Sequence, residues 1–596
     1  MGEATWTGET VPAPDLVGSA GLRFWWRTFE AVQELFAEGH GQEGDEDDPL
    51  PAKVFRGLPR HVLSEPARRI GDARWSFPGF LRAHAGNAPR LTALDEPDLS
   101  ALLQHAYGLV RMELGPHAAW PYHRAVASAR CFHPVELYLW LARPAGALPA
   151  GCYHYDPAHH ALTGLRPGGL PTELRAATGA GGEDTLALVV AAVCFRKSAF
   201  RYRDYAYRLC AQEVGMTVGN VLLVGGALGL RARVHHRFDD AVVNRALGLD
   251  GVEETAFAVL DLGPARPAET RATPLDGEPT EPAEPRTPLT LAPLPPIRPS
   301  HLRTNTVDPA AWSGLAELDR AGRLTGTGAG LAAPVEPAAF HLPADRPRSA
   351  RPIPASGEEP PAGGVELARA LRARDSGGRM FLPDGAALPA RELAGLLRYA
   401  LEPVASDHTE AACRPLVDCH VLVLNVDGVP AGLYRLDAEP SLEPDPSLEP
   451  DPSSEPEPWR GPGPRPDAGP RPVAAPELVP LPGRAWHGVV SMLCDRTPAV
   501  NTAKANAVVF LSVDRVQGDR WFGDRGYRIL HHEGGIVAQR ISVLAAAAGL
   551  SARITNGYHD GAVRALIGAG PAQVPVFTLV LGRRRATAQY EPPLTW

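Results

Sequence analysis

Two stretches of the chain share one pattern and decide its fold. Residues 213–230 read EVGMTVGNVLLVGGALGL, and residues 533–550, which lie 320 positions later, read EGGIVAQRISVLAAAAGL. In both stretches, small and apolar residues recur at helical spacing, which predicts a tightly packed core helix that ends at a glycine. The chain therefore contains an internal repeat.

The likeness continues on both sides of these two helices. Downstream, RVHHRFDDAVVNRALGL from Arg233 corresponds to RITNGYHDGAVRALIGA from Arg553, and each half then closes on an apolar strand that ends at glycine. Upstream, the strand-turn-strand pattern of residues 133–156 recurs over residues 414–437, which predicts one antiparallel hairpin in each half. The sequence predicts an α+β fold with two tandem copies of one unit, packed together as an intramolecular pseudo-dimer.

Proline-rich segments set the expected domain boundaries. The repeat places one unit in residues 1–263 and the other in residues 346–596, with a linker over residues 264–345. The linker begins PARPAETRATPLDGEPTEPAEP, which holds too few apolar residues to offset the entropy of ordering it. The repeat SLEPDPSLEPDPSSEPEP marks a second such segment, over about 439–472, which we expect to be a disordered insertion without chemistry of its own.

Composition excludes several classes of protein. The 596 residues include 59 Lys and Arg against 68 Asp and Glu, a net charge of −9, which argues against nucleic-acid or anionic-lipid partners. The seven cysteines are scattered, with no CxxC pair, which argues against a zinc ribbon or a disulfide scaffold and favours a reducing compartment. With neither a signal peptide nor an apolar run long enough to cross a bilayer, a cytoplasmic protein without membrane contact is expected.

The histidines do not predict a metal site. His235–His236 and His531–His532 are adjacent pairs, and adjacent side chains on a strand or helix point to different faces. We therefore interpret them as structural, and predict no metal ligand. No glycine-rich phosphate loop follows a predicted strand, so neither a dinucleotide-binding fold nor an ATPase is indicated.

Several motifs, in order along the chain, resemble the flavin-dependent nitroreductase superfamily. They include LSALLQHAYGL from Leu99, HPVELY from His133, PAGCYHYD from Pro149, and the two core helices. Within that superfamily the likeness is to the azoline dehydrogenases that mature ribosomal peptides such as streptolysin, microcin B17, cyanobactins and thiopeptides. PAKVFRGLPRHVL, from Pro51, is similar to a segment of that branch. The resemblance implies FMN bound at the interface of the two units.

The resemblance implies that residues of the second half bind the FMN phosphate. RARDSGGRMF supplies Arg374, Ser376 and Arg379, whereas the matching GNAPRLTAL of the first half lacks the serine. A phosphate dianion favours guanidinium donors together with a hydroxyl. In GRRRA, Arg583 and Arg585 follow the last strand, where the family places further cations that contact the phosphate.

Other expected contacts to the flavin come from both halves. In ITNGYHD the second half offers Asn556 and Gly557 to the flavin edge, where the first half has the bulky Arg237. A glycine there would let the backbone approach the ring. The turn that the family donates across the interface survives in the first half as Ser128, Ala129 and Arg130. These complementary losses predict one composite site and close to one FMN per chain.

The catalytic residues are expected in RYRDYAYR of the first half. The azoline dehydrogenases carry a Lys-Tyr pair there, and this chain has Arg201 and Tyr202, whereas the second half has Trp521 and Phe522. The resemblance implies proton transfer by Tyr202 and stabilisation of negative charge by Arg201. The implied substrate is a thiazoline or oxazoline in a modified precursor peptide, oxidised by hydride transfer to the flavin, with a cyclodehydratase or synthetase complex as partner.

Two other functions stay open at this point. The chain could be a nitroreductase-type enzyme that oxidises NAD(P)H and reduces small molecules. Alternatively, because the lysine is replaced and the serine and glycine motifs are eroded, it could be a flavin-free pseudoenzyme that binds a precursor peptide as a scaffold. Oxidation of NAD(P)H and uptake of flavin distinguish these functions.

Overall fold

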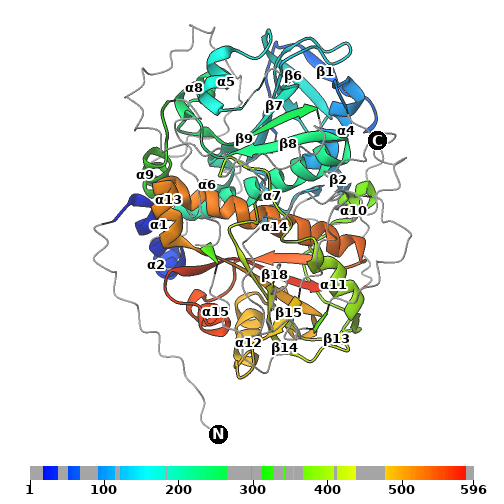
Figure 1. Ribbon diagram of the computed structural model, residues 1–596, viewed down its shortest axis with the longest axis vertical. Coiled ribbons are helices and arrows are strands. Elements are labelled where there is room, and N and C mark those ends of the chain that lie inside the picture. The colour runs from blue at the N-terminus through cyan, green and yellow to red at the C-terminus, as the bar shows by residue number, and fades with distance from the viewer. Residues whose placement is uncertain are drawn as a thin grey trace, which may run out of the picture.

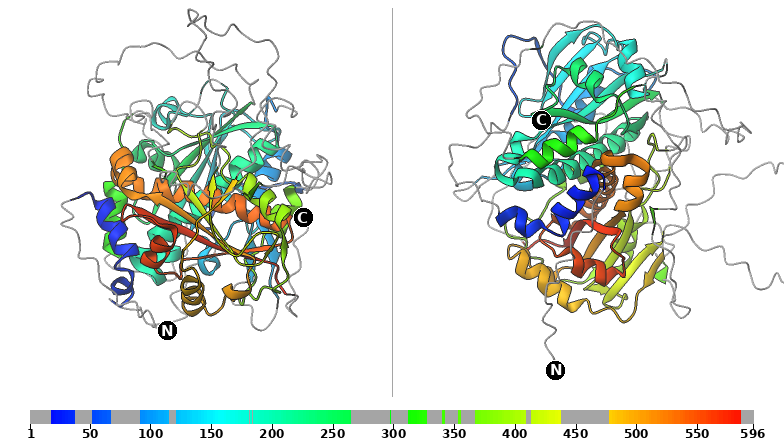
Figure 2. Two further views of the ribbon diagram at one scale, coloured as in Figure 1. Left: turned by 60° about the horizontal axis from the view of Figure 1, so that its bottom comes forward. Right: turned by 90° about the vertical axis from the view of Figure 1, so that its left-hand side faces the viewer.

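The computed structural model describes residues 18–37, 52–66, 91–114, 121–180, 182, 184–264, 297, 312–326, 340–341, 353–354, 367–408, 413–437 and 477–585. Within these residues each half of the chain forms its own seven-stranded sheet. Two long helices lie side by side between the sheets (Figures 1 and 2). The predicted α+β fold of two tandem units is confirmed.

The first sheet has the order β1-β6-β5-β4-β7-β9-β8, and every neighbouring pair is antiparallel. Its strands are β1 (Arg60–Val62), β4 (Val135–Leu141), β5 (Gly151–Asp156), β6 (Ala161–Pro167), β7 (Ala187–Cys194), β8 (Leu230–His235) and β9 (Glu254–Pro264). The predicted hairpin is β4 and β5, with Tyr138 opposite His154.

The second sheet repeats this order as β10-β15-β14-β12-β16-β18-β17. Its strands are β10 (Ile353–Pro354), β12 (Asp418–Val423), β14 (Gly432–Asp437), β15 (Glu477–Pro480), β16 (Ala507–Asp514), β17 (Ser551–Thr555) and β18 (Gln573–Gly582). The predicted insertion at 439–472 lies outside the described residues, between β14 and β15, which pair antiparallel. Two-stranded sheets are formed by β2 (Leu109–Met112) with β3 (Tyr122–Arg124) and by β11 (Leu388–Pro389) with β13 (Val426–Asp427).

The two core helices are α7 (Ala206–Ala227) and α14 (Gly526–Ala547), whose bounds are also 320 residues apart. Each begins seven residues before the stretch that predicted it. At their crossing, a Cβ on Gly215 would lie 2.5 Å from the carbonyl oxygen of His532, and one on Gly535 would lie 2.7 Å from the Cα of Gly215. These glycines occupy the same position of the repeat and let the two backbones touch, which explains the small residues of the pattern.

The remaining described helices cover the sheets and the ends of the core pair. They are α1 (Ala20–Phe29), α2 (Val32–Ala37), α4 (Glu96–Tyr107), α5 (Thr172–Thr178), α6 (Arg196–Tyr202), α8 (Asp240–Leu247), α9 (Ser313–Ala321), α10 (Leu367–Ala373), α11 (Ala390–Arg398), α12 (His487–Arg496), α13 (Arg515–Phe522) and α15 (Asp560–Ile567). The pairs α6 and α13, and α8 and α15, again occupy equivalent positions of the two halves.

Part of the predicted linker is folded. Residues 313–321 form α9, which buries Leu315 and Leu318 together with Trp312 just before it. The backbone N–H of Leu315 donates to Asp204 Oδ1 at 2.8 Å, so this segment is tied to the first half. A short apolar pattern with helical spacing is therefore enough to order a segment that is flanked by proline-rich sequence.

The segment before residue 38 joins the two halves. In α1, Trp25 stacks on His531 with ring centroids 4.8 Å apart and packs against Tyr527 at 4.4 Å. The backbone N–H of Gly21 donates to Asp524 Oδ1 at 2.7 Å. Although α1 belongs to the first half by sequence, it is packed against α14 of the second.

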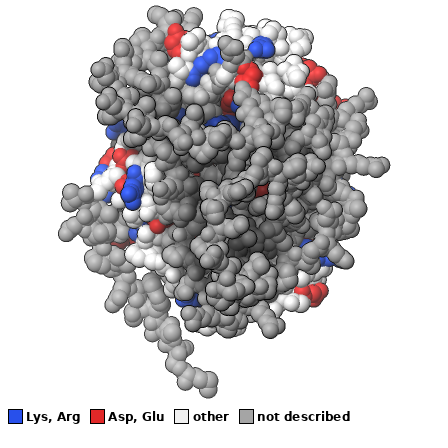
Figure 3. All heavy atoms as spheres, viewed as in Figure 1, with Lys and Arg blue, Asp and Glu red and all other residues white. Residues whose placement is uncertain are grey.

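One helical stretch, Arg196–Ala227, is long and apolar enough by composition to cross a membrane, although the sequence showed no uninterrupted apolar run of that length. In the structure 89% of its most apolar window is buried, as in the core helix of a folded domain. On the face drawn in Figure 3, the described charged side chains of both signs are interspersed.

Candidate functional site

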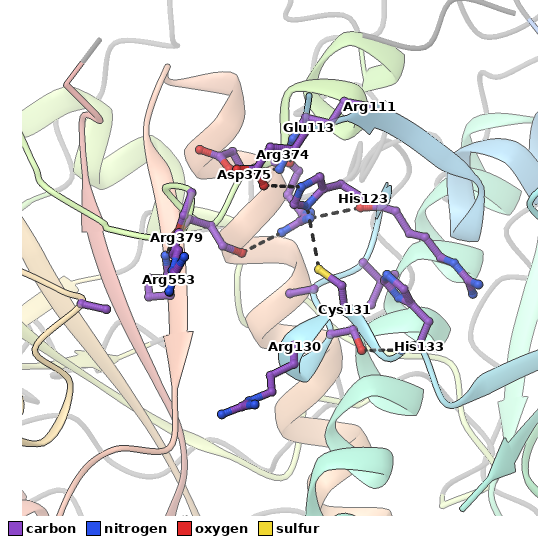
Figure 4. Close-up of a pocket in the computed structure, with 17 residues that line it drawn as sticks. Arg111, Glu113, His123, Arg130, Cys131, His133, Arg374, Asp375, Arg379 and Arg553 are labelled. Carbon is purple, nitrogen blue, oxygen red and sulfur yellow. Dashed lines mark hydrogen bonds and ion pairs between the residues drawn. The ribbon is translucent and has the colours of Figure 1, made fainter. Parts of the chain in front are cut away.

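A cavity of about 340 Å³ lies at the contact of the two halves, next to the crossing helices. This volume is within the usual range for small-molecule sites. The first half lines it with Arg111, Glu113, His123, Arg124, Val126, Ala127, Ser128, Arg130, Cys131 and His133. The second half lines it with Arg374, Asp375, Ser376, Gly378, Arg379, Ala499 and Arg553. Figure 4 shows these side chains converging from strands and loops of both halves.

The cavity carries an excess of positive charge, because six arginines line it against two carboxylates. Arg124 and Arg374 are 6% and 3% exposed, and among the described residues no hydrogen bond reaches the Nε atom of either. Buried charges without an opposite charge are costly. The lining therefore favours an anion.

Contacts between the two halves fix the arginines. Arg111 NH1 donates to the Arg374 carbonyl at 2.7 Å, and Arg111 NH2 pairs with Asp375 Oδ1 at 3.0 Å. Arg374 NH2 donates to the Arg124 carbonyl at 3.1 Å, and its NH1 lies 3.3 Å from Ser376 Oγ. Arg553 Nε donates to the Ser376 carbonyl at 2.6 Å. The guanidinium groups are thus positioned before any ligand arrives.

The protonation states in the cavity follow from burial and these charges. Burial, together with the nearby charge of Arg111, lowers the pKa of Arg374 to about 10, so Arg374 is still a cation at neutral pH. Burial alone would raise the pKa of Asp375, but the charges of Arg111 and Arg584 bring it down to about 2. Burial raises the pKa of the Cys131 thiol to about 11, so Cys131 is not a nucleophile.

The turn from Ser128 to His133 forms the first half's wall. Arg130, Cys131 and His133 have φ of 51°, 55° and 48°, a left-handed conformation that non-glycine residues rarely adopt. Ser128 Oγ accepts the backbone N–H of His133 at 2.9 Å and fixes the turn. Strain of this kind concentrates at functional sites, where it presets the position of side chains.

His133 adds a neutral imidazole to this wall. Its Nδ1 atom faces Glu213 Oε1 of α7 at 3.7 Å. Burial, with the charge of Arg124 nearby, lowers the pKa of His133 to about 4. The imidazole is therefore uncharged at neutral pH and can accept a proton.

The predicted catalytic pair lies beside the cavity rather than on its lining. Arg201 and Tyr202 end α6, and Arg130 connects Tyr202 to the cavity. Burial raises the pKa of Tyr202, and the charges of Arg130 and Arg201 with a hydrogen bond from Arg130 offset only part of this rise. The phenol is therefore protonated at neutral pH.

The turn directly after Tyr202 is strained. Arg203 has φ 48° and ψ −133°, and Gly523, at the equivalent position of the second half, has φ 58° and ψ −147°. Only glycine adopts this conformation readily. In the first half, Arg203 thus adopts a backbone conformation typical of glycine, directly after Tyr202, which we expect to act in catalysis.

The structure brings together five of the residues expected to contact the cofactor, because Ser128, Arg130, Arg374, Ser376 and Arg379 all line the cavity. Ala129 lies in the same turn. The predicted composite of the two halves is thus present in the lining, since no one half supplies all five.

Asn556 and Gly557 are not on the lining. Asn556 forms an amide pair with Gln212 of α7, at 2.9 and 3.2 Å. A Cβ on Gly557 would lie 2.6 Å from Thr497 Cγ2, so packing within the second half already requires glycine there. Their contact with a flavin stays a prediction.

At the end of β18, the arginine that points inward is Arg584, one position away from the two arginines that we expected. Arg583 and Arg585 are exposed and do not line the cavity, whereas Arg584 NH1 pairs with Asp375 Oδ2 at 3.4 Å. Successive side chains of an extended segment point in opposite directions, so an inward Arg584 turns both neighbours outward. Of the three arginines, Arg584 is the one whose pairing with a lining residue the structure shows, and contact of Arg583 or Arg585 with a phosphate stays a prediction.

Sequence reasoning missed Arg111, Arg124 and Arg553. Arg111 and Arg124 lie on the small β2–β3 sheet, and Arg553 lies on β17 at the position that Arg233 holds in the first half. An isolated arginine on a short strand is usually a surface residue. Comparison of the two halves did not single out Arg553 either, because the first half has an arginine, Arg233, at the equivalent position.

The donors on the cavity lining match a dianionic phosphate, the charged group of FMN. Arg374 and Arg124 present guanidinium groups with unsatisfied Nε atoms, and Ser376 adds a hydroxyl, which is the donor set that a phosphate requires. The fit supports the phosphate end of FMN at residues 374–379.

Comparison with known proteins settles the fold. A crystal structure from Anabaena variabilis, described as a candidate nitroreductase, matches 95% of this chain and 100% of its own length with a TM-score of 0.64 and 20% identity. The chain has the nitroreductase fold. No protein-family model matches it.

Sequence similarity lies with two proteins that process peptide products. The chain is 30% identical over 134 residues to the microcin B17-processing protein McbC of Escherichia coli, and 28% identical over 143 residues to the trifolitoxin-processing protein TfxB of Rhizobium leguminosarum bv. trifolii. These matches cover 21% and 23% of this chain, and 49% and 38% of the two relatives. The chain thus spans about half or less of the relatives that it matches. The predicted resemblance is confirmed.

Proposed function

We propose that this protein is an FMN-dependent dehydrogenase that oxidises thiazoline or oxazoline rings of a modified precursor peptide to thiazoles or oxazoles. The observation that carries the proposal is the cavity between the halves, where six arginines outnumber two carboxylates. The nitroreductase fold and the similarity to McbC and TfxB support it.

The second half would hold the phosphate of the cofactor. Arg374 would give a guanidinium whose direction is fixed by its contacts to Arg124 and Ser376, and Arg553 would add a second from β17. Bound FMN would supply the acceptor for the hydride, which is chemistry that no side chain provides. Ser128 and Arg130 of the first half would close the cavity over it.

Aromatisation of an azoline removes a hydride and a proton, and this chain must handle the proton. Tyr202 is protonated at neutral pH, because burial raises its pKa, so it would donate a hydrogen bond to the substrate or pass a proton onward. His133 is neutral and could accept the proton. Arg201 and Arg130 would stabilise negative charge as the proton leaves.

The proposed partners are the modified precursor peptide and a cyclodehydratase or synthetase complex that makes the azoline. Their support is the similarity to McbC and TfxB, which are named for the processing of microcin B17 and trifolitoxin.

Anaerobic mixing tests the proposed activity. The full chain, loaded with FMN, should lose the visible absorbance of oxidised flavin when an azoline-containing peptide is added. Mass spectrometry should find the peptide lighter by two hydrogens per ring. Reduction by NAD(P)H without any reaction of the peptide would favour the small-molecule nitroreductase. A colourless protein that takes up no FMN would favour the scaffold.

A further inference from the structure

A second cluster of polar side chains lies buried where the two halves meet, away from the cavity lining. It consists of His236 directly after β8 of the first half, His408 on a loop of the second half, and Glu533 of α14. We call these three residues the histidine cluster. Their side chains are 0–1% exposed.

The three side chains converge on one point. His408 Nε2 lies 3.3 Å and His236 Nε2 lies 3.7 Å from Glu533 Oε1, and one ligand atom of each residue lies within 4.8 Å of the others. Zn²⁺ holds nitrogen and oxygen ligands at about 2.0–2.1 Å in a tetrahedron, so neighbouring ligand atoms are about 3.4 Å apart. The two separations from Glu533 Oε1 to the histidine nitrogens, 3.3 and 3.7 Å, are close to that spacing.

Nothing else satisfies the converging atoms. Among the described residues, no hydrogen bond reaches His236 Nε2, His408 Nε2 or Glu533 Oε1. A buried polar atom without a partner costs about 1–3 kcal/mol, and more when it is charged. The two histidine nitrogens lie at ion-pair distance from Glu533 Oε1, and one cation between them would satisfy all three atoms.

Surrounding contacts orient the cluster as outer contacts orient metal ligands. His236 Nδ1 lies 3.1 Å from His532 Nδ1, and His408 Nδ1 lies 3.8 Å from Asp407 Oδ1, so each ring turns its Nε2 atom to the centre. Glu533 Oε2 accepts the backbone N–H of Leu416 at 3.2 Å, which leaves Oε1 for the centre.

A backbone link between the halves fixes the two histidines relative to each other. The backbone N–H of Val234, on β8, donates to the Ala405 carbonyl at 3.0 Å, and that of Asp407 donates to the Val234 carbonyl at 3.1 Å. Asp407 Oδ2 also accepts the backbone N–H groups of His236 and Arg237, at 3.0 and 2.8 Å. The site is therefore assembled only when the halves pack together.

The rule that adjacent histidines do not share an ion still holds. The cluster takes His236 from one adjacent pair and no residue from His531–His532, and it is completed by His408 and Glu533 of the second half. The sequence could not place His408 beside His236, because 172 positions separate them.

We propose that His236, His408 and Glu533 bind one Zn²⁺ and so clamp the two halves together. Two imidazoles and one carboxylate are ligands that Zn²⁺ favours, and the fourth position would hold water. This site is separate from the cavity that we assign to FMN, and it does not depend on the proposed function.

The metal content of the purified full chain tests this proposal. After dialysis against a chelator and then addition of ZnCl₂ and removal of the excess, we expect one Zn²⁺ per chain by mass spectrometry of the metal. Co²⁺ in its place should give the visible absorption of a tetrahedral site. Zn²⁺ should also raise the melting temperature of the chelated protein, since it binds only the folded state.

Two near-isosteric variants locate the ion. His408→Asn and Glu533→Gln should each weaken Zn²⁺ binding on the order of 100-fold or more and abolish the rise in melting temperature. Glu213→Gln is the matched control, because Glu213 holds the equivalent position in α7, and it should bind Zn²⁺ like the unaltered chain. Circular dichroism of each variant checks that it folds.

The proposal is overturned if the folded, unaltered chain retains no Zn²⁺. It is also overturned if both near-isosteric variants fold and bind Zn²⁺ as tightly as the control. If His408→Asn fails to fold, Glu533→Gln and the Co²⁺ spectrum of the unaltered chain decide. The flavin measurements are made on separate samples, so loss of either proposal leaves the other standing.

Discussion

Glu213 and Glu533 occupy the same position of the repeat, in α7 and α14, but their neighbours differ. Glu213 accepts the hydroxyl of Tyr107 at 2.8 Å and faces a single histidine, His133, on the wall of the arginine-lined cavity. Glu533 faces two histidines, His236 and His408, in a buried cluster. We call the arginine-lined cavity the open site and the position of the histidine cluster the filled site.

The residues that precede these two glutamates also have different partners in the two halves. Gln212 of α7 pairs with Asn556 through two amide hydrogen bonds, whereas at the equivalent positions His532 faces His236. Arg237 stands where the second half has Gly557, and its guanidinium lies 5.0 Å above the Phe522 ring. The two equivalent positions thus differ in chemistry, although the helices that carry them cross at matching glycines, Gly215 and Gly535.

The largest effect should come from Arg374, which lines the open site. Arg374→Ala should weaken FMN binding by about 100-fold or more, because it removes a buried guanidinium from the phosphate. Gel filtration followed by flavin absorbance measures the retained cofactor. Arg369→Ala, on the exposed side of the same helix α10, should retain it like the unaltered chain. Equal retention in both variants would place the phosphate elsewhere.

Next in size is the effect of Tyr202, whose counterpart in the filled half is Phe522. Tyr202→Phe should leave FMN bound and slow azoline oxidation on the order of 100-fold, the usual contribution of one proton-transfer group. Tyr434→Phe removes a hydroxyl that donates to the Pro430 carbonyl at 2.8 Å in the hairpin of the second half, and so controls for a lost hydroxyl. Normal turnover by Tyr202→Phe would refute the catalytic assignment.

The pH dependence of stability reports on His133, the histidine of the open site that faces Glu213. The pKa of His133 is about 4 in the folded chain and about 6.5 when unfolded, so the unfolded state binds the proton first as pH falls. His133 should therefore cost about 1.4 kcal/mol of folding free energy per pH unit between about 6.5 and 4, and nothing above 6.5. Urea unfolding at several pH values should show a shallower acid slope for His133→Gln.

A contrary contribution comes from Asp560, whose pKa burial raises to about 7. Its protonation favours the folded state as pH falls, so the difference between His133→Gln and the unaltered chain is the informative quantity. An identical slope in the two proteins would mean that His133 is solvated or charged when folded.

The smallest effect tests whether the filled site could be reopened by one change. Arg237→Gly restores the residue type of Gly557, but the first half lacks the serine that accompanies Arg374 in the second. Arg237→Gly should therefore bind no additional FMN, measured as flavin per chain. A second equivalent of flavin would show that Arg237 alone blocks the site.

The repeat made the fold predictable, because α7 and α14 carry glycine at matching positions, Gly215 and Gly535, where their backbones touch. The open site was predictable in part. Arg374, Ser376 and Ser128 were found by resemblance, but Arg111 and Arg124 lie on a two-stranded sheet whose pairing joins residues across a turn and cannot be read from either strand alone.

The direction of each arginine at the end of β18 could not be predicted, for a simple physical reason. The sequence shows three consecutive arginines, but it does not show which side of the strand each one faces. That side depends on the strand register, because a change of one residue moves every side chain to the opposite face. The histidine cluster was beyond reach for a related reason. It combines residues of both halves, and only their packing brings His236 and His408 together.

The most direct test of one open and one filled site is the number of flavins that the purified full chain binds. Reconstitution with excess FMN, removal of the unbound cofactor, and measurement of flavin and protein in the same sample should give close to one FMN per chain. Two FMN per chain would mean that both equivalent sites work, and none would mean that the arginine-lined cavity serves another anion.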